Sequence, residues 1–311
     1  MKTGKMILMQ TALLILLVPA VLFPFFREGA REVAHAASAA PEPRRILVRH
    51  GDVNIKMELE EYVVGVVLAE MPAEYEPEAL KAQAVVARTF VWKAACTGGK
   101  HGDGAVCTDP ACCQGYVASG QFLQSYGTDA DLEKIRAAVS DSAGLVLTYG
   151  GELIEATYFS STAGYTEDAA AVWGSSYPYL VPRESPEQVP EEYTVYSRAW
   201  LEKNLGVRLG EDTQSWFSQW EYTAGEGVAS VSVGGRSFSG TTLRQKLQLR
   251  STVFFVTVQN DAAIFCTRGY GHRVGMSQLG ADAMAAAGST FADILSYYYP
   301  GTALEEITDY H

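Results

Sequence analysis

The sequence predicts an α+β fold, built from helices and antiparallel hairpins that occupy separate stretches of the chain. Strand-forming segments are broken by turn residues at Gly150-Gly151, Gly234-Gly235 and Asn260-Asp261, which is the pattern of β-hairpins. Two windows near the start of the folded part instead carry apolar residues at helical spacing. The sequence has neither a repeat of fixed period nor a glycine-rich phosphate loop after a strand. Strands and helices grouped in this way indicate the α+β class.

The composition is that of a folded, net acidic protein. Hydrophobic residues make up 48% of the 311 residues and charged residues 19%, which excludes a disordered polyelectrolyte. The formal net charge is −12, from 24 Lys and Arg against 36 Asp and Glu. Nucleic acids are bound by clustered basic residues, so we expect no nucleic-acid ligand.

Residues 1–32 predict an N-terminal transmembrane helix. Lys2 and Lys5 precede an apolar run over residues 6–26, which at ~1.5 Å per residue reaches ~31 Å as a helix and can cross a bilayer. The more positive N-terminal side stays in the cytoplasm, so this single-pass anchor places the rest of the chain outside it, at the cell membrane. A cleaved signal peptide is the alternative, because Ala37–Ala40 supplies small residues. The length of the apolar run favours the uncleaved anchor.

Residues 33–45 predict a flexible tether, since they are rich in Ala, Pro and Ser without apolar periodicity. The folded domain then spans residues 46–311, with a first strand-like segment at Val53–Met57. The predicted hairpins are Leu145–Tyr158 around Gly150-Gly151, Val228–Val233 with Arg236–Phe238, and Val253–Val258 with Ile264–Cys266.

Two helices are predicted between the first strand and the hairpins. The first covers about Leu59–Leu68 and ends before Pro72, which disfavours helical geometry in the residue before it, so Glu70 sits where the chain turns. The second covers about Pro77–Ala95, with proline in its first turn and two glycines after its end. Its apolar residues recur every three or four positions, whereas Lys81 and Arg88, seven apart, share another face.

The loop after the second helix carries His101, Cys107, Cys112 and Cys113. Zinc binds imidazole and thiolate ligands in a tetrahedral array, and this residue set is typical of such a site. Disulfide bonding is the alternative outside the cytoplasm. Five cysteines leave one unpaired, and the adjacent pair would be strained, so we favour a metal. Cys96 and Cys266 fit core or helix-end positions.

Three separate blocks of sequence resemble one family, the stage II sporulation protein D family, which is related to the amidase enhancer. They span nearly the whole folded domain in family order. Arg273 departs from the resemblance, because we expect the family to carry glycine there. The blocks are Glu60–Gly65 through Glu70-Met71-Pro72 to Glu78–Ala84 and Ala87–Phe90; Phe159–Glu167 with Trp173-Gly174; and Gly269–Ala281 with Tyr298–Thr302.

The resemblance implies a lytic transglycosylase that cuts peptide-free peptidoglycan glycan strands during engulfment of the forespore, with Glu70 as catalytic acid. It also implies a location in the mother-cell membrane, facing the septal space, and stage II sporulation proteins P and M as partners. Fold and resemblance together predict mixed helices and antiparallel hairpins around a glycan-binding cleft.

The chemistry of Glu70 can be argued separately. Glycosidases use two carboxyl groups, one as acid and one to activate water or attack the sugar. In muramic acid the sugar's own O6 hydroxyl can attack the anomeric carbon, so one carboxyl that gives and then takes a proton suffices. Such a carboxyl must keep its proton near neutral pH, which Val67, Leu68, Met71 and Pro72 can favour as an apolar wall. The alternative is a glutamate that merely caps or pairs at a helix end.

Further cleft residues follow from the resemblance and from residue type. Lys81 and Arg88 resemble groove positions and can hold the lactyl carboxylate of muramic acid, or can belong to a solvated helix face. His272, Ser277 and Gln278 lie in a glycine-rich segment that suits a polar cleft wall. Tyr165 and Trp173 can stack on sugar rings or belong to the core.

The resemblance implies that His101, Cys107 and Cys113 hold zinc. Because Glu70 already explains the chemistry, we expect the zinc to be mainly structural. Cys112 stays open, as a fourth ligand, a free thiol or a competitor for Cys113. Two other functions remain open as well. The protein can be a non-catalytic, glycan-binding activator of an N-acetylmuramoyl-L-alanine amidase, or a zinc hydrolase that activates water at the His101 cluster.

Overall fold

The computed structural model describes residues 44–51 and 53–307. The predicted anchor (1–32) and nearly all of the predicted tether (33–45) lie outside the described residues. Within the described ranges, no helix has both the length and the apolar character needed to cross a membrane.

Both predicted helices are confirmed, and each extends two residues beyond its predicted end. Helix α1 (Leu59–Glu70) stops before Met71, which is extended because proline follows it. Helix α2 (Pro77–Thr97) ends at Gly98, whose φ of 87° is in the left-handed region that glycine adopts without strain. Glu70 is therefore the last helical residue before a sharp turn.

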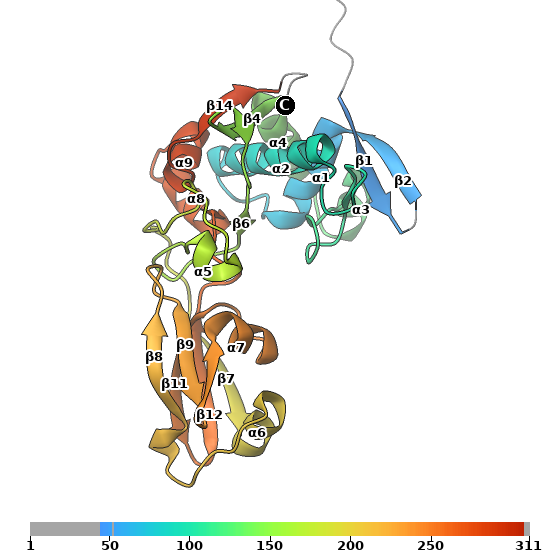
Figure 1. The fold of residues 1–311 in the computed structure, drawn as a ribbon. Helices are drawn as coiled ribbons and strands as arrows, with labels where there is room; N and C mark the ends of the chain where they lie inside the picture. The colour runs from blue at the N-terminus through green and yellow to red at the C-terminus, as the bar shows by residue number, and fades with distance from the viewer. Residues whose placement is uncertain (1–43, 52, 308–311) are drawn as a thin grey trace, which may run out of the picture. The chain divides into compact units, whose positions relative to one another are not determined.

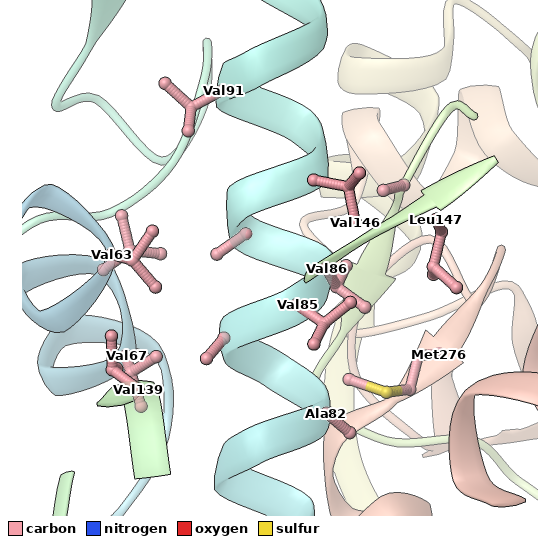
Figure 2. Packing of buried hydrophobic residues seen from close by; sticks show 14 of the residues in the cluster. Val63, Val67, Ala82, Val85, Val86, Val91, Val139, Val146, Leu147 and Met276 are labelled. Carbon is pink, nitrogen blue, oxygen red and sulfur yellow. The ribbon is translucent and has the colours of Figure 1, made fainter. Parts of the chain in front are cut away.

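Helix α2 is the centre of the larger hydrophobic core. Val63 and Val67 of α1 lie on one side of it, while Val146 and Leu147 lie on another together with Met276 (Figure 2). Helix α2 also contacts α4, α8 and α9. The remaining helices are α3 (Ser119–Ser125), α4 (Asp129–Asp141), α5 (Ala169–Trp173), α6 (Arg198–Leu205), α7 (Gly240–Lys246), α8 (Gln278–Ala286), α9 (Phe291–Tyr298) and the 3-10 turn η1 (Thr213–Ser215).

In the described part of the chain, the strands form five small sheets, as expected for an α+β protein (Figure 1). Most neighbouring pairs are antiparallel; β1–β3 and β6–β13 are parallel. The sheets are β2 (Val53–Glu58) with β1 (Arg45–His50) and β3 (Val106–Cys107); β14 (Ala303–Glu306) with β4 (Leu145–Tyr149) and β5 (Glu152–Leu153); β13 (Met276–Ser277) with β6 (Tyr158–Phe159); β10 (Arg236–Ser239) with β9 (Val228–Val233) and β8 (Phe217–Tyr222); and β11 (Val253–Gln259) with β12 (Ala262–Arg268) and β7 (Glu192–Ser197).

All three predicted hairpins are present, as β4–β5, β9–β10 and β11–β12. Both turn residues of each hairpin have positive φ, which matches the right-handed twist of the strands. The first hairpin is shorter than predicted, because its second strand ends at Leu153 instead of Tyr158. Tyr158 belongs to β6 and pairs in parallel with Met276. This pairing brings the second and third of the three sequence blocks together at one place.

A second hydrophobic cluster forms from residues 201–265, around Trp216, Phe254 and Phe265. The first cluster contains residues 46–180 and 274–307. The chain therefore leaves the first core after Leu180 and returns to it at Val274. The stretch 186–240, where the sequence shows few motifs, contributes the start of the second core.

Arg273 connects these parts of the fold. Its guanidinium is buried, forms an ion pair with Glu167 at 2.9 Å, and donates to the Gly225 carbonyl at 2.7 Å and the Tyr165 carbonyl at 3.1 Å. Its φ is 65°, a conformation that favours glycine. Arg273 adopts this conformation although it is not glycine, and its side chain forms a buried ion pair.

Candidate functional site

A cavity of about 520 Å³ opens beside the end of α1. We call it the metal-side cavity, because Cys112 and Cys113, two members of a cluster of possible metal ligands, line it. Segments far apart in sequence build it: the end of α1, the loop between α2 and α3, β6, α5 and the loop before α8. Its lining residues are Glu70, Phe90, Lys100, Pro110, Ala111, Cys112, Cys113, Gln114, Ala156, Thr157, Tyr158, Phe159, Ser160, Trp173, Tyr270, Gly271, His272 and Gln278.

The Glu70 carboxyl is half-buried at this cavity and held by the loop that follows α2. Its Oε1 accepts a hydrogen bond from the Gly115 backbone N–H at 2.7 Å. A Cβ on Gly115 would lie only 2.8 Å from Oε1, so the close approach needs glycine. On this side the apolar wall comes from Phe90, Ala156 and Phe159. Of the wall residues predicted from the sequence, Leu68, Met71 and Pro72 line a second cavity next to Glu70, and Val67 is buried in the core.

Tyr158 adds a second hydrogen-bond donor to this carboxyl. Burial, and next the Glu70 charge, raises the pKa of Tyr158 well above its usual range, and its hydroxyl hydrogen-bonds to Glu70. The Gln114 amide in turn donates to the Tyr158 oxygen at 3.4 Å. The phenol therefore keeps its proton and stays a donor at physiological pH.

His272 lines the same cavity as a neutral ring. Burial, assisted by the Arg244 charge, lowers the pKa of His272 to about 4. Its Nδ1 accepts a hydrogen bond from the Val274 N–H at 3.1 Å. The ring lies 5.1 Å, centroid to centroid, from that of Trp173, which is 45% exposed. Gln278 also lines the cavity and donates to Gln83 Oε1 at 3.4 Å.

The structure does not bring four of the predicted cleft residues to this lining. Arg88 is 0% exposed and forms an ion pair with Glu60 at 2.6 Å, so its charge is paired in the protein interior and does not face the cavity. Lys81 pairs with Glu78 at 2.9 Å and with Asp141 at 3.1 Å.

Ser277 and Tyr165 likewise serve the fold. The buried Ser277 hydroxyl donates to Glu187 at 2.6 Å and accepts from the Gly280 N–H, which caps α8. Tyr165 forms a β-bridge with Glu184, and its carbonyl accepts from Arg273.

A cluster of possible metal ligands borders the cavity. The donor atoms of His101, Cys107, Cys112 and Cys113 all lie within 4.8 Å of one another. His101 Nε2 is 3.6 Å from the Cys113 sulfur and 3.9 Å from the Cys112 sulfur, and the two sulfurs are 3.9 Å apart. Zn–S bonds of ~2.3 Å at tetrahedral angles separate two sulfurs by about 3.8 Å. The donor set therefore fits a tetrahedral metal site, with Cys112 as its fourth member.

The local backbone supports this arrangement. The N–H groups of Cys112 and Cys113 both donate to the Asp109 carbonyl, at 3.0 and 2.8 Å. Cys107 lies in β3, which pairs with β1. No disulfide joins any of the five cysteines, all of which lie in the described part of the chain.

The thiols of the cluster differ in acidity. Burial raises the pKa of Cys107, but hydrogen bonds from the Asp109 backbone and from the other cluster side chains outweigh it and lower the pKa to about 7. Burial raises the pKa of Cys113 to about 12. A bound cation would favour the thiolate form of every cysteine that it contacts.

The sequence profile of the family described as "Stage II sporulation protein" matches residues 50–149, which contain Glu70 and the whole His/Cys cluster. Stage II sporulation protein D of Bacillus subtilis (strain 168) is 40% identical over 256 residues, covering 80% of this chain and 74% of that protein. The protein of the same name from Bacillus amyloliquefaciens is 36% identical and covers 98% of this chain and 96% of its own length. The chain belongs to the stage II sporulation protein D family.

Another relative carries a different name. The Amidase enhancer of Bacillus subtilis (strain 168) is 31% identical over 298 residues, covering 77% of this chain and 40% of that protein. The two relatives named stage II sporulation protein D confirm the family membership predicted from the three sequence blocks.

In this member of the stage II sporulation protein D family, several residues at the cavity were not predicted from the sequence. Tyr158, Gly115 and Lys100 touch the site, but each lies in a strand or loop segment with no distinctive local pattern. The clash between an added Cβ on Gly115 and Glu70 Oε1, which requires glycine there, depends on a contact across 45 residues. Only the folded chain shows it.

Proposed function

We propose that this protein is a lytic transglycosylase that cleaves peptide-free peptidoglycan glycan strands during forespore engulfment in sporulation. One observation carries the proposal: Glu70 supplies the one carboxyl group among the described residues that line the metal-side cavity. Hydrolysis by ordinary glycosidases needs two carboxyl groups at the bond. A single carboxyl matches a reaction in which the sugar itself is the nucleophile.

The reaction balances without water or any other reagent. Protonated Glu70 gives its proton to the O4 of N-acetylglucosamine, and the bond from this oxygen to C1 of muramic acid breaks. The O6 hydroxyl of the same muramic acid bonds to C1 and passes its proton to the Glu70 carboxylate. The products are a 1,6-anhydromuramic acid end and a free 4-hydroxyl, and Glu70 is protonated again.

The neighbours of Glu70 suit this two-way proton transfer. The Gly115 N–H and the Tyr158 hydroxyl fix the carboxyl, and neither releases a proton at physiological pH. His272 is neutral near pH 7, so it brings no cation to the cavity. Orientation by such fixed groups is how a positioned acid gains rate.

We further propose that His101, Cys107, Cys112 and Cys113 hold zinc in a structural role. Four protein ligands close a tetrahedral shell and leave no position for an activated water, which disfavours the zinc hydrolase alternative. The ion would instead fix the loop that carries Gln114 and Gly115 against Glu70. Elemental analysis of the purified chain tests this: one zinc per chain supports it, and a metal-free chain that cleaves glycan overturns it.

The proposal includes the membrane location. Residues 1–32 would stay attached as a single-pass anchor, holding the catalytic domain outside the cytoplasm and beside stage II sporulation proteins P and M. Support comes from the apolar run at residues 6–26 and from family membership. Intact mass of the membrane-extracted chain tests the anchor, and co-purification tests the partners; a mature chain lacking residues 1–32 contradicts the anchor.

A second candidate is a non-catalytic, glycan-binding activator of an N-acetylmuramoyl-L-alanine amidase. The relative named Amidase enhancer favours it. The two functions differ in what they require of Glu70. An activator needs the cavity to bind glycan, whereas the transglycosylase also needs the carboxyl to transfer a proton.

The experiment compares the full-length chain with Glu70→Gln on glycan strands stripped of peptides. The glutamine side chain keeps an oxygen that can accept the hydrogen bond from the Gly115 N–H, but it has no acidic proton. The substitution therefore removes the acid with little change in shape. Glu76→Gln, an exposed glutamate outside the cavity, is the matched control. Mass spectrometry should find 1,6-anhydro ends with the original chain and with the control but not with Glu70→Gln. Stimulation of an amidase that survives in Glu70→Gln, without such ends, would favour the activator.

A further inference from the structure

A second cavity, of about 300 Å³, adjoins Glu70. It is formed by the turn after α1 together with α3 and α4, and we call it the tyrosine-side cavity. Among the described residues, Glu70 alone lines both this cavity and the metal-side cavity. Its lining residues are Leu68, Ala69, Glu70, Met71, Pro72, Ala73, Glu74, Phe122, Tyr126 and Asp131.

Exposed aromatic rings mark both cavities. Tyr126 is 67% exposed, and its ring packs edge-on against Phe122 at a centroid distance of 5.2 Å. In the metal-side cavity, Trp173 is 45% and Tyr270 50% exposed. Flat apolar rings beside polar groups are the usual surface for a sugar. A glycan that contacts rings in both cavities would place one of its glycosidic bonds at Glu70.

The two cavities differ in charge. Lys100 lines the metal-side cavity, where Glu70 is the one carboxyl, and its ammonium donates to the Cys112 carbonyl. The tyrosine-side cavity is lined by Glu74 and Asp131, with no lysine or arginine in its described lining. Hydrogen bonds from Thr128 lower the pKa of Asp131, so it is ionised at neutral pH.

The substrate has a matching difference. Muramic acid without its peptide carries a lactyl carboxylate, whereas N-acetylglucosamine is uncharged. An ammonium group favours the carboxylate through a charge-assisted hydrogen bond, and two carboxylates repel it. The charged sugar therefore fits the metal-side cavity, and the neutral sugar fits the tyrosine-side cavity.

We propose that Glu70 separates two glycan subsites: the reacting muramic acid lies beside Lys100, and the departing N-acetylglucosamine lies against Tyr126. The inference rests on the proposed function and adds the direction of the strand. Because the bond that breaks joins C1 of muramic acid to O4 of N-acetylglucosamine, the reducing end of the strand leaves through the tyrosine-side cavity.

The test measures binding to the full-length chain carrying Glu70→Gln, so that cleavage does not interfere. Two probes are used: peptide-free glycan strands, and all-N-acetylglucosamine oligomers of equal length, which lack carboxylates. Adding Lys100→Gln should weaken binding of the strands by a factor of roughly three to ten and leave the oligomers unchanged. Adding Tyr126→Ala should weaken both probes by a similar factor.

Three further variants serve as controls. Lys246→Gln and Tyr222→Ala change exposed residues outside both cavities and should leave binding unchanged. Lys100 adjoins the His/Cys cluster, so Lys100→Arg is included; it keeps the charge and should restore preference for the strands. If Lys100→Arg does not restore the preference for the strands, then Lys100→Gln weakens binding by disturbing the loop between α2 and α3 and not by removing the charge. That result would overturn the placement of muramic acid beside Lys100.

Equal loss for both probes in Lys100→Gln, or full affinity in Tyr126→Ala, would also overturn the inference. A failure of the proposed function looks different. The binding pattern would then hold, while the chain with Glu70 intact releases no 1,6-anhydro ends. That result would leave the two subsites standing as those of a glycan-binding protein.

Discussion

At the scale of single residues, His272 shows how the cleft changes the chemistry of a side chain. Folding removes the ring from water, so the native state disfavours its protonated form. Between pH 6.5 and 4 the unfolded chain binds this proton and the native chain does not. The free energy of unfolding should therefore fall as the pH drops through this window, by at most about 3 kcal/mol from this residue.

Urea unfolding at pH 7 and pH 4.5 checks this expectation. The loss of stability between the two pH values should be smaller in His272→Gln than in the unchanged chain, because glutamine does not titrate. His50→Gln, at an exposed histidine of β1, should show the full loss. An equal loss in His272→Gln would show that the ring is solvated.

The sequence pattern around Pro72 predicted the position of Glu70 at a cavity, whereas residue spacing did not predict where Lys81 and Arg88 lie in the fold. The turn before Pro72 pointed to Glu70, which lies at a cavity. The seven-residue spacing of Lys81 and Arg88 correctly placed both on one helix face, but spacing does not tell which neighbour covers that face. Burial of the Arg88–Glu60 pair is a property of the assembled core.

At the scale of elements, the loop between α2 and α3 sets the position of Glu70. Gly115→Ala tests this, since the new Cβ would lie 2.8 Å from Oε1 and 3.5 Å from the Ala69 Cβ. We expect the carboxyl to move and glycan cleavage to fall by about 10- to 100-fold, because small misplacements of a catalytic group are costly. The melting temperature should change by only a few degrees.

Gly120→Ala is the matched control, because a Cβ there meets nothing within 4 Å. It lies in α3, where alanine is favoured over glycine, so stability should rise slightly and cleavage should persist. Unchanged cleavage by Gly115→Ala would contradict the role given to the loop.

Local patterns predicted the first two helices and the three hairpins and failed where distant segments pair. Helices α1 and α2 and the three hairpin turns follow from spacing, proline and glycine. The parallel pair β6–β13 joins Tyr158 to Met276, far away in sequence, and each strand has only two residues. So short a pairing leaves no periodic signal, yet it carries Tyr158 into the cavity.

At the scale of the whole molecule, the described residues form two hydrophobic cores, and Arg273 joins segments of both regions. Arg273→Gly relieves a left-handed backbone at a gain of about 1 kcal/mol, but it leaves Glu167 buried without its partner. An unpaired buried charge costs about 3–5 kcal/mol, so the free energy of unfolding should fall by roughly 2–4 kcal/mol.

Urea unfolding of Arg273→Gly and of the double variant Arg273→Gly/Glu167→Gln checks this balance. The second change removes the buried charge and should recover part of the lost stability. A glycine variant as stable as the unchanged chain would show that the ion pair contributes nothing net. The two-core organisation itself was not predictable, because the hairpin signal at Gly234-Gly235 does not tell which other segments its strands pack against.

The central claim is that the sugar's own hydroxyl, and not water, closes the reaction started by Glu70. Digestion of peptide-free glycan strands in ¹⁸O-labelled water, followed by mass spectrometry of the new ends, tests it most directly. The account predicts 1,6-anhydro ends with no ¹⁸O at the cleaved position. Reducing ends that contain ¹⁸O would contradict it, since they would show that water attacks the anomeric carbon.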